Sequence, residues 1–352
     1  MLSQSLLYTY QRYRTLQTDR IRALPIVILM PHSACNCQCV MCDIWKDNKN
    51  LKQLREEDIT GLMQSLKKFG TREVVMSGGE ALLNPNFFRF CEILKKEGIK
   101  ITVLSTGLTL KRNAGRILQW VNQVIVSLDG DKATHDRIRN ISGAFGKLRE
   151  GVMELKSMNP SFRISGRTVI HRLNFRNWPA IIERAREMGL DQVSFLPADV
   201  SSHAFNREMA WTEPRQHEIL LSREELSELN DIIRKLILKY KSGGEGSFIA
   251  ESAEKLQKLH DYYAAFYGLN PFPYKKCNAP WVSTVIEADG TVRPCFFHEA
   301  LGNIHEESLD RILNSRTALS FRRSLDIDKN EICAKCVCYL NLPPGMNPAA
   351  GS

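Results

Sequence analysis

Several features that mark membrane-spanning, secreted or repetitive proteins are missing from this sequence of 352 residues. It has no uninterrupted apolar run of about eighteen residues, so we expect no transmembrane helix. The first strongly apolar stretch, residues 23–30, is too short and too far from the N-terminus for a secretory signal. Internal repeats and low-complexity segments are also lacking before the Pro/Ala/Gly-rich end. These absences predict a cytoplasmic globular protein.

The composition adds few restrictions. Hydrophobic residues make up 43% and charged residues 25% of the chain, which is ordinary for a globular protein. The formal net charge of +9 fits either a basic surface with no special partner or a polyanionic ligand such as a nucleotide, a phosphorylated sugar or nucleic acid. The length favours about two domains, or one barrel with an appendage.

Cysteine is absent from the middle of the chain, and nine of the ten cysteines fall into two groups. A secreted disulfide scaffold would be short and rich in cysteine throughout, so this distribution favours metal ligation in a reducing cytosol. The tenth, Cys91, lies on the apolar face of a predicted helix, where a small core residue is expected. The two groups are Cys35, Cys37, Cys39 and Cys42, and Cys277, Cys295, Cys333, Cys336 and Cys338.

Short apolar runs alternate with amphipathic helical segments over the first two hundred residues. Six of these runs, bounded mostly by Gly, Pro or Asp, have the character of buried parallel strands. Six strand–helix units in this order predict an α/β fold, either a parallel sheet or a partial (β/α)6 barrel of the TIM type. The predicted strands are 25–30, 73–77, 101–105, 123–128, 163–170 and 192–196.

The pattern changes after about residue 200. Ser222 and Glu225 form a capping box that opens a helix, a Gly/Ser-rich turn follows at 241–247, and a second helix runs to about Tyr267. From Cys277 on, an Asp-Gly turn between two short strands indicates a small metal-bound module. The predicted divisions are an N-terminal extension 1–24, a barrel domain 25–200, a helical connection 201–276, a cysteine-rich module 277–340 and a tail 341–352.

The first cysteine group is spaced to hold one iron–sulfur cubane. Cys35, Cys39 and Cys42 can each ligate one iron, which leaves the fourth iron open for a substrate or cofactor. Cys37 lies between these ligands and is expected to be a bystander. The group directly follows the first predicted strand, and the carboxyl ends of the strands form the catalytic face of α/β barrels. On spacing alone, a zinc site is the alternative.

A second motif, Ser77-Gly78-Gly79-Glu80, follows the second predicted strand. Its glycines let the backbone approach a ligand closely, and its carboxylate can accept hydrogen bonds from an ammonium group. Together with the cysteine spacing, this motif resembles the radical S-adenosylmethionine (SAM) superfamily. The resemblance implies that the open iron chelates SAM, that one electron from the cluster cleaves it, and that the 5′-deoxyadenosyl radical takes a hydrogen atom from the substrate. It also implies SAM contacts for Gly78, Gly79, Glu80 and Met41, although this family usually has an aromatic residue in place of Met41.

The ends of the later strands extend this resemblance. The third predicted strand ends in Ser-Thr-Gly and the fourth in Ser-Leu-Asp-Gly, and a helical segment with His135 and Arg139 follows. This order is similar to the subgroup that contains sulfatase and peptide maturases. Arginine offers a carboxylate two parallel donors, but a structural salt bridge is the alternative for Arg139, and turn or capping roles are the alternatives for Asp129 and His135. The SAM contacts that the resemblance implies here are Thr106, Ser127, Arg139 and Leu196.

The second cysteine group has the spacing of a four-ligand site. A tight Asp-Gly turn brings Cys277 and Cys295 together across a hairpin, and the pair Cys333 and Cys336 can supply two more thiolates. On spacing alone, a zinc ribbon is the alternative. A cysteine, then Gly-x4-Cys, then a distant Cys-x-x-Cys resembles the short "twitch" form of the SPASM extension, which implies one auxiliary [4Fe–4S] cluster with an electron-transfer role. Spacing favours Cys336 over Cys338 as the fourth ligand.

Residues that bind the substrate are expected in the loops after the fifth and sixth strands. No single residue there stands out as a catalytic base or as the group that quenches a radical. The catalytic candidates are His171, Asp199 and His203, and the wider set of substrate candidates adds Arg172, Asn174, Asn206 and Arg207.

Three functions follow from these features. The first is hydrogen abstraction from a polar small molecule, such as a sugar, an aminocyclitol or a nucleotide-like metabolite, with the auxiliary cluster accepting an electron. The second is a peptide- or protein-modifying maturase, against which the short segment 1–24 counts, because many maturases carry an N-terminal leader-binding module. The third is a nonenzymatic iron–sulfur carrier or zinc-stabilised binding protein, which the Gly-Gly-Glu motif disfavours. For the enzyme we expect a flavodoxin- or ferredoxin-type electron donor and no nucleic-acid or membrane partner.

Overall fold

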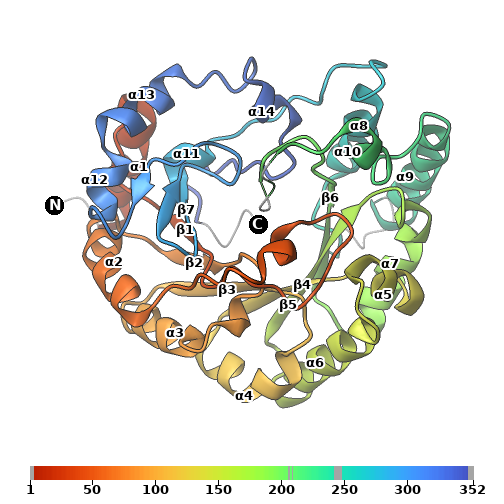
Figure 1. The fold of residues 1–352 in the computed structure, drawn as a ribbon, viewed down its shortest axis with the longest axis horizontal. Coiled ribbons are helices and arrows are strands. Elements are labelled where there is room, and N and C mark those ends of the chain that lie inside the picture. The colour runs from red at the N-terminus through yellow and green to blue at the C-terminus, as the bar shows by residue number, and fades with distance from the viewer. Residues whose placement is uncertain (1–3, 205–206, 208, 242–247, 348–352) are drawn as a thin grey trace.

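A nine-stranded, largely parallel sheet forms the centre of the computed structural model, which describes residues 4–204, 207, 209–241 and 248–347. Strands β1 to β6 lie side by side in chain order, all parallel, and curve into an open ring with helices outside (Figure 1). The predicted α/β fold with a partial barrel is confirmed. The strands are β1 (Ile26–Leu29), β2 (Glu73–Met76), β3 (Lys100–Ser105), β4 (Gln123–Ser127), β5 (Arg163–Ile170) and β6 (Gln192–Pro197).

Strand β7 (Ser283–Ile286) extends the sheet beyond β1. It pairs parallel to β1, with Thr284 opposite Val27. Strands β8 (Thr291–Arg293) and β9 (Gly302–Asn303) follow with antiparallel pairing. The cysteine-rich C-terminal part therefore continues the barrel sheet instead of standing apart from it.

Helices cover the outer face of the sheet between consecutive strands (Figure 1). Most of these helices bury an apolar stripe at helical spacing, as in α3, where Phe87, Phe90 and Leu94 are enclosed. No helix in the described ranges is long and apolar enough to cross a membrane. The helices are α1 (Gln4–Thr18), α2 (Glu56–Phe69), α3 (Phe87–Lys96), α4 (Leu110–Trp120), α5 (Lys132–Arg139), α6 (Ala144–Met158), α7 (Trp178–Glu187), α8 (Glu213–His217), α9 (Glu225–Lys241), α10 (Ala253–Ala265), α11 (Ala279–Val282), α12 (Leu309–Leu313), α13 (Arg316–Ser324) and α14 (Glu331–Lys335), with short 3-10 turns at Ile44–Asp47, Ala81–Leu83 and Phe175–Asn177.

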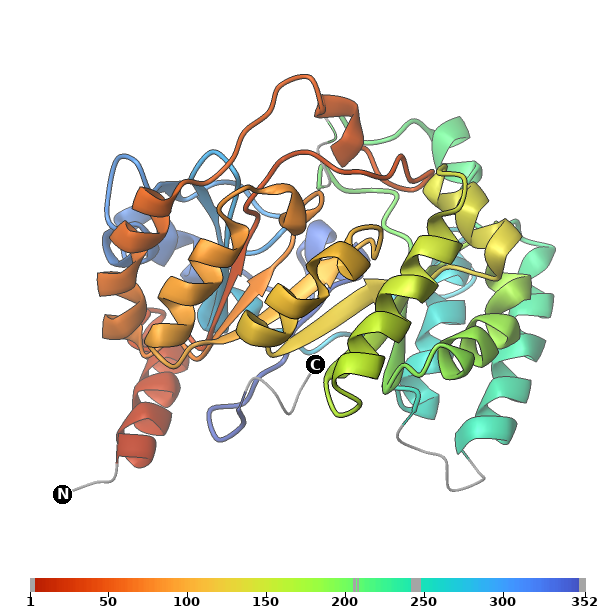
Figure 2. The same cartoon turned by 90° about the horizontal axis from the view of Figure 1, so that it is seen from below.

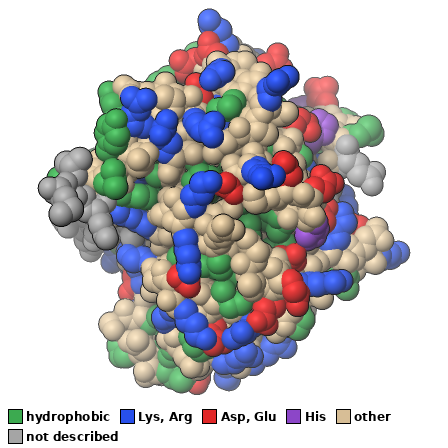
Figure 3. All heavy atoms as spheres, turned by 90° about the vertical axis from the view of Figure 1, so that its left-hand side faces the viewer, with side chains coloured by type: hydrophobic (Ala, Val, Ile, Leu, Met, Phe, Trp, Pro, Cys, Tyr) green, Lys and Arg blue, Asp and Glu red, His purple; other side chains and the backbone are tan. Residues whose placement is uncertain are grey.

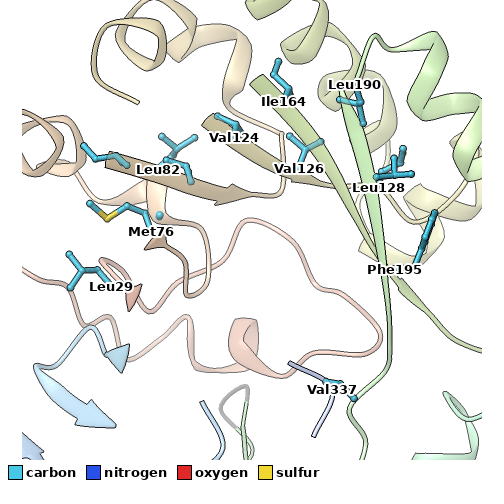
Figure 4. Packing of buried hydrophobic residues seen from close by; sticks show 14 of the residues in the cluster. Leu29, Met76, Leu82, Val124, Val126, Leu128, Ile164, Leu190, Phe195 and Val337 are labelled. Atoms are coloured by element: carbon cyan, nitrogen blue, oxygen red, sulfur yellow. The ribbon is translucent and has the colours of Figure 1, made fainter. Parts of the chain in front are cut away.

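Alternate residues of each strand point to opposite faces of the sheet. Leu29 of β1 and Met76 of β2 are fully buried in the layer between the sheet and the helices. Figure 4 shows the same layer continuing through Val126 of β4, Leu128 and Phe195 of β6. Strand β1 is apolar on both faces, whereas β5 alternates buried residues on its outer face with the polar Arg163, Ser165 and Arg167 on its inner face.

The C-terminal segment covers the inner face of the sheet at β1. Leu342 is 1% exposed and packs with Ile26 and Ile28, which project away from the helices. The guanidinium of Arg12, from α1, donates hydrogen bonds to four backbone carbonyl oxygens between residues 342 and 346. Because six strands do not close a barrel, the apolar inner face needs a cover from elsewhere in the chain. The described part of the predicted tail, residues 341–347, is thus anchored on the sheet through Leu342.

Candidate active site

The loop that carries the first cysteine group runs over the carboxyl ends of the strands (Figure 2). Two backbone hydrogen bonds close its base, from Ser33 N to Lys52 O (2.9 Å) and from Leu54 N to Pro31 O (3.0 Å). We call residues 31–54 the cysteine loop. The carboxyl ends of parallel strands are where α/β enzymes bind their ligands, so the loop lies where a catalytic centre is expected.

The Gly-Gly-Glu turn packs directly against the cysteine loop. The Glu80 N–H donates to the Ala34 carbonyl oxygen over 2.9 Å, and a methyl group added at Gly79 would lie 2.1 Å from that same oxygen. Gly78 has a φ of +104°, which residues with a side chain rarely adopt. Both glycines are needed to bring the carboxylate motif beside Cys35, so the two sequence motifs form one site.

Glu80 is fully buried within a shell of hydrogen-bond donors. Its Oε2 accepts from the backbone N–H of Thr106 (2.8 Å), the hydroxyl of Thr106 (2.7 Å) and the hydroxyl of Ser105 (3.0 Å). Its Oε1 accepts from the Leu82 N–H over 3.2 Å. Burial raises the pKa of Glu80, and the hydrogen bonds oppose that shift. The carboxylate is therefore fixed in position before any ligand binds.

Asn36 links this carboxylate to the cysteines. Its Oδ1 lies 2.9 Å from the Thr106 hydroxyl, which can donate to either Asn36 or Glu80. Its Nδ2 is buried without a hydrogen-bond partner. Buried amide donors are rarely left unsatisfied in native proteins. An unused donor between the first cysteine and a buried carboxylate therefore fits a site that receives a polar ligand.

A buried arginine connects α5 to the middle ligand of the cysteine loop. Arg139 Nη1 donates to the Cys39 sulfur over 3.4 Å, and Nη2 is ion-paired with Asp129. Hydrogen bonding by the Cys37 thiol, helped by the charge of Arg139, lowers the pKa of Cys39 although burial opposes the shift. The thiolate is the form that binds iron. The salt bridge considered for Arg139 is present, and Cys37, expected to be a bystander, hydrogen-bonds its neighbour.

The other two predicted cysteine ligands of the loop, Cys35 and Cys42, are half-buried. Burial raises the pKa of Cys35 and of Cys42 to about 12, and the nearby Cys39 adds to both shifts. Within the described ranges, no three His, Cys, Asp or Glu side chains converge on a single metal ion. A cubane does not require such convergence, because each thiolate ligates a different iron. Three neighbouring thiols beside a guanidinium thus suit an anionic cluster better than a lone ion.

The chain after β6 lies against the cysteine loop. Trp211 donates its indole N–H to Asp43, the residue after Cys42, over 2.7 Å. Arg207 stacks on the Trp211 ring at 4.0 Å and is ion-paired with Asp199 at 2.8 Å. Contacts between successive side chains thus connect the segment after β6 with Asp43, which is adjacent to the last cysteine of the loop.

The three catalytic candidates lie in different surroundings. Asp199 is buried in its salt bridge, whereas His203 is exposed. His171 is fully buried, and its Nδ1 accepts from the Leu173 N–H over 3.3 Å. Burial lowers the pKa of His171 to about 3, so the ring is neutral. Asn206, a substrate candidate, lies outside the described residues.

The remaining candidates near these loops hold the fold together. Arg172 is ion-paired with Glu225 at 3.1 Å. Asn174 donates to the backbone carbonyl of Asp129 over 3.1 Å. His135 Nδ1 accepts from the Asp129 N–H over 3.2 Å, which agrees with the capping role considered for it.

The inner face of the barrel carries the other expected SAM contacts. Ser127 and Leu196, at the carboxyl ends of β4 and β6, are half-buried there, and Met41 is half-buried in the cysteine loop. Two polar groups were missed. Arg167 of β5 donates from Nε to a β6 hydroxyl over 3.3 Å, and burial raises the pKa of Glu251 to about 7. The two-residue period of β5 could have placed Arg167 on this face.

The second cysteine group joins three parts of the chain. Cys277 precedes α11, Cys295 follows β8, and Cys333 and Cys336 lie within and just after α14. Burial raises the pKa of Cys333 to about 12, and the nearby thiols of Cys295 and Cys277 add to this shift. The same two thiols and the adjacent Cys338 thiol add to the raised pKa of Cys336. Cys336 stays the predicted fourth ligand.

His298 was also missed in the sequence. Its Nε2 lies 3.3 Å from the Cys333 sulfur, and its side chain is buried. Burial lowers the pKa of His298. The signal was present as the spacing Cys295-x-x-His298, which has the form of a metal-ligand pair.

A groove of about 750 Å³ lies between α1, α2 and α12, on the side of the strands' amino ends. It includes Arg22, which precedes β1, and Phe69, which precedes β2, so it is at the opposite end of the sheet from the cysteine loop. Figure 3 shows Lys and Arg side chains spread over this side of the molecule with Asp and Glu between them. We therefore place no active site there.

Known proteins share both parts of this arrangement. The model of the radical SAM superfamily matches residues 29–197, and that of the SPASM iron–sulfur cluster-binding domain matches residues 277–337. The first match runs from the end of β1 to the end of β6, and the second runs from Cys277 to just past Cys336. The chain therefore belongs to the radical SAM superfamily and carries a C-terminal SPASM domain. It is an enzyme that uses SAM with a [4Fe–4S] cluster and holds an auxiliary cluster, so the nonenzymatic alternative is wrong.

Individual relatives differ in how much they share. The chain is 23% identical over 351 residues to a cysteine-type anaerobic sulfatase-maturating enzyme of Clostridium novyi, covering 91% of this chain and 86% of that protein. It is 26% identical over 198 residues to an Fe-coproporphyrin III synthase of Methanosarcina barkeri, covering 54% of this chain and about half, 49%, of that protein. The crystal structure of Streptococcus suis SuiB bound to precursor peptide SuiA superposes with a TM-score of 0.66 at 14% identity, covering 92% of this chain and 73% of that chain.

Proposed function

We propose that this protein is a peptide- or protein-modifying radical SAM enzyme, which abstracts a hydrogen atom from an amino-acid residue of its substrate. The observation that carries this proposal is the extent of similarity to the sulfatase-maturating enzyme, which runs through both domains. The shared fold with an enzyme crystallised on its precursor peptide agrees with it. A maturase was our second expectation, and the short segment 1–24 does not outweigh this similarity.

A polar small molecule, our first expectation, is the second candidate. The relative whose name denotes a porphyrin product matches only 54% of this chain, so its similarity bears on the shared radical chemistry more than on the substrate. Arg167 and Glu251 give the barrel polar groups that either a peptide or a metabolite could use.

For the SAM site, we propose that Cys35, Cys39 and Cys42 ligate the cluster. When bound, that cluster supplies the electron that cleaves SAM. Glu80 is the acceptor for the amino group of SAM, and Gly78 and Gly79 let the backbone approach it. Further contacts come from the carboxyl ends of the strands, from α5 and from the cysteine loop. They are Met41, Thr106, Ser127, Arg139 and Leu196.

The chain prepares this site before SAM arrives. Thr106 and Ser105 hold the Glu80 carboxylate in one orientation. Arg139 is held by Asp129 against the Cys39 sulfur, so its positive charge is available both to the anionic cluster and to a ligand carboxylate. Preorganised groups of this kind reduce the entropy lost on binding.

For the second site, we propose that Cys277, Cys295, Cys333 and Cys336 ligate one auxiliary [4Fe–4S] cluster that takes up an electron. Its four thiolates leave no open iron. A flavodoxin- or ferredoxin-type protein supplies the first electron, and the need for reduced clusters agrees with the cytoplasmic location expected from the sequence.

The test uses hydrogen isotopes to find the substrate class. Cells are grown in deuterated medium, and their extract is separated by size into two fractions. One contains the polypeptides, and the other contains metabolites smaller than a short peptide. Each fraction is incubated anaerobically with reconstituted enzyme, SAM and dithionite. We expect deuterium in 5′-deoxyadenosine with the polypeptide fraction, and its loss when that fraction is first digested to amino acids.

The control is the Cys39→Ala variant, which should form no 5′-deoxyadenosine with either fraction. Deuterium transfer from the metabolite fraction alone would overturn the peptide assignment in favour of the small-molecule candidate.

A further inference from the structure

His298 is held against one sulfur of the second cysteine group. Its Nε2 lies 3.3 Å from the Cys333 sulfur. Its ring packs edge-on against Phe321 with centroids 5.0 Å apart, and its backbone oxygen accepts from Arg293 Nη1 over 3.1 Å. The residue is 7% exposed. The imidazole is therefore fixed by packing and by its backbone, and its place beside Cys333 is not a chance surface contact.

The direction of this contact follows from the chemistry of the sulfur. A cysteine that ligates iron is a thiolate and has no proton to give, so it can only accept. An imidazole in either protonation state has at least one N–H. The tautomer with its proton on Nδ1 would aim the Nε2 lone pair at an anionic sulfur, so once Cys333 ligates the auxiliary cluster, as proposed above, the favoured form has its N–H on Nε2 and donates to Cys333.

A donor at a ligating sulfur acts on the cluster's reduction potential. It withdraws charge from the thiolate and so stabilises the reduced cluster, which carries one more negative charge than the oxidised one. Burial strengthens the effect, because little solvent screens the interaction. His298 lies where it can make the auxiliary cluster easier to reduce.

We infer that His298 is a positioning residue of the auxiliary site, which donates an N–H···S hydrogen bond to Cys333 and raises the reduction potential of the auxiliary cluster. This inference rests on the auxiliary-ligand assignment in the proposed function and not on the identity of the substrate. In this arrangement the four cysteines of the second group, Cys277, Cys295, Cys333 and Cys336, ligate all four irons of the cluster. His298 binds no iron.

The test measures that potential directly. Cys35, Cys39 and Cys42 are replaced together by Ala, so that the auxiliary cluster is the only one left, with about four irons per chain. The midpoint potential is then measured by an EPR-monitored redox titration. We expect His298→Phe to shift it to a more negative value, and His298→Gln, whose amide can still donate, to recover part of the shift.

His305→Phe is the matched control. His305 belongs to the same domain, but its side chain is exposed and its Nε2 faces Asp58 at 3.0 Å. Its replacement should leave the potential unchanged. An unchanged potential in His298→Phe with full iron content would overturn the inference. So would a strong hyperfine coupling to an imidazole nitrogen that disappears in His298→Gln, because His298 would then be an iron ligand.

Two further outcomes separate this inference from the proposed function. If His298→Phe fails to hold iron, His298→Gln decides, because its amide is a weaker donor than an imidazole N–H. A potential more negative than that of the parent supports the inference, and a potential equal to that of the parent overturns it. Failure of the deuterium experiment with polypeptides would remove the proposed substrate class without affecting the potential shift, since that shift needs no substrate.

Discussion

The two cysteine sites differ in how the chain builds them. The first takes all its proposed ligands from one stretch, 35–42, and adds a charged donor, Arg139, which needs its own buried counter-charge, Asp129. The second takes its proposed ligands from three distant segments of the chain. Its added donor, His298, can donate a hydrogen bond while uncharged, and no buried acid lies beside it in the described contacts. A local site depends on the packing of its loop, whereas a dispersed site depends on the whole fold.

Removing the ligands should give the largest effect and the clearest separation of the two sites. Replacing Cys35, Cys39 and Cys42 together by Ala is expected to remove about four irons per chain and to abolish SAM cleavage. Iron and 5′-deoxyadenosine are measured after anaerobic reconstitution, which should give about eight irons for the parent protein.

Replacing Cys333 and Cys336 by Ala should also remove about four irons but should leave reductive SAM cleavage in place. Cys91→Ala is the control, because that thiol is buried in α3 away from both groups and should not alter the iron content. Loss of SAM cleavage in the second variant would show that the sites depend on each other more than the geometry indicates.

A single methyl group should be enough to break the local site. Gly79→Ala places its Cβ 2.1 Å from the Ala34 carbonyl oxygen, so the cysteine loop must move. We expect iron to fall toward about four per chain, with the auxiliary EPR signal retained.

Gly61→Ala is the matched control for this change. Gly61 lies within α2 with nothing near its added methyl, so the substitution should stabilise the helix by about 0.5–1 kcal/mol and leave both clusters intact. If Gly79→Ala retained its full iron content and SAM affinity, the close packing of the two motifs would not be required.

Replacing Arg139, the charged donor of the first site, should lower the free energy of unfolding more than replacing His298, the donor of the second site. Arg139→Gln leaves Asp129 buried without a counter-charge, and we expect a loss of about 3–5 kcal/mol in the free energy of unfolding of the apoprotein in urea. His298→Phe strands no buried acid and should cost about 1 kcal/mol.

The double variant Arg139→Gln/Asp129→Asn should regain most of the stability lost by the single one, since it removes the stranded charge. Equal losses in the single and double variants would mean that Arg139 stabilises the fold through its packing and not through the ion pair.

The smallest expected effect concerns the chain after β6. Trp211→Phe removes the hydrogen bond to Asp43 and keeps the ring that Arg207 stacks on. A loss of about 1.5 kcal/mol should let the cysteine loop open roughly tenfold more often, which is measured as faster release of iron to a chelator.

Trp281→Phe provides the comparison for this change. Its indole makes a similar bond to Asp19 over 2.8 Å, away from the cysteine loop. Its iron release should match that of the parent protein. Equal acceleration in both variants would point to general loosening of the fold.

Sequence patterns predicted the parts of this molecule that are local. The six barrel strands, the two cysteine groups and the Gly-Gly-Glu turn each depend on neighbouring residues and periodicity, and the strands lie close to where they were expected. The contact between Arg139 and Cys39 joins positions 100 residues apart, and that between Trp211 and Asp43 joins positions 168 apart. The periodicity of apolar residues along the sequence cannot predict contacts between residues so far apart.

Other features were missed because they depend on what the rest of the fold leaves uncovered. An incomplete barrel exposes the edge of β1 and part of its inner face. Strand β7 pairs with that edge, and Leu342 covers that face. The roles of His171 and Asp199 were uncertain for a related reason. Both residue types suit catalysis, but only the three-dimensional surroundings distinguish an enclosed structural group from a reactive one.

The cover that Leu342 provides for β1 also gives the molecule an order of assembly. Ribosomes make β1 and the cysteine loop early, but residues 336–342, which bring the fourth auxiliary ligand and the apolar cover of the inner face, are made long after them. During synthesis the inner face of β1 therefore stays open to solvent and to chaperones. The arrival of the later segment, fastened by Arg12, then covers this face.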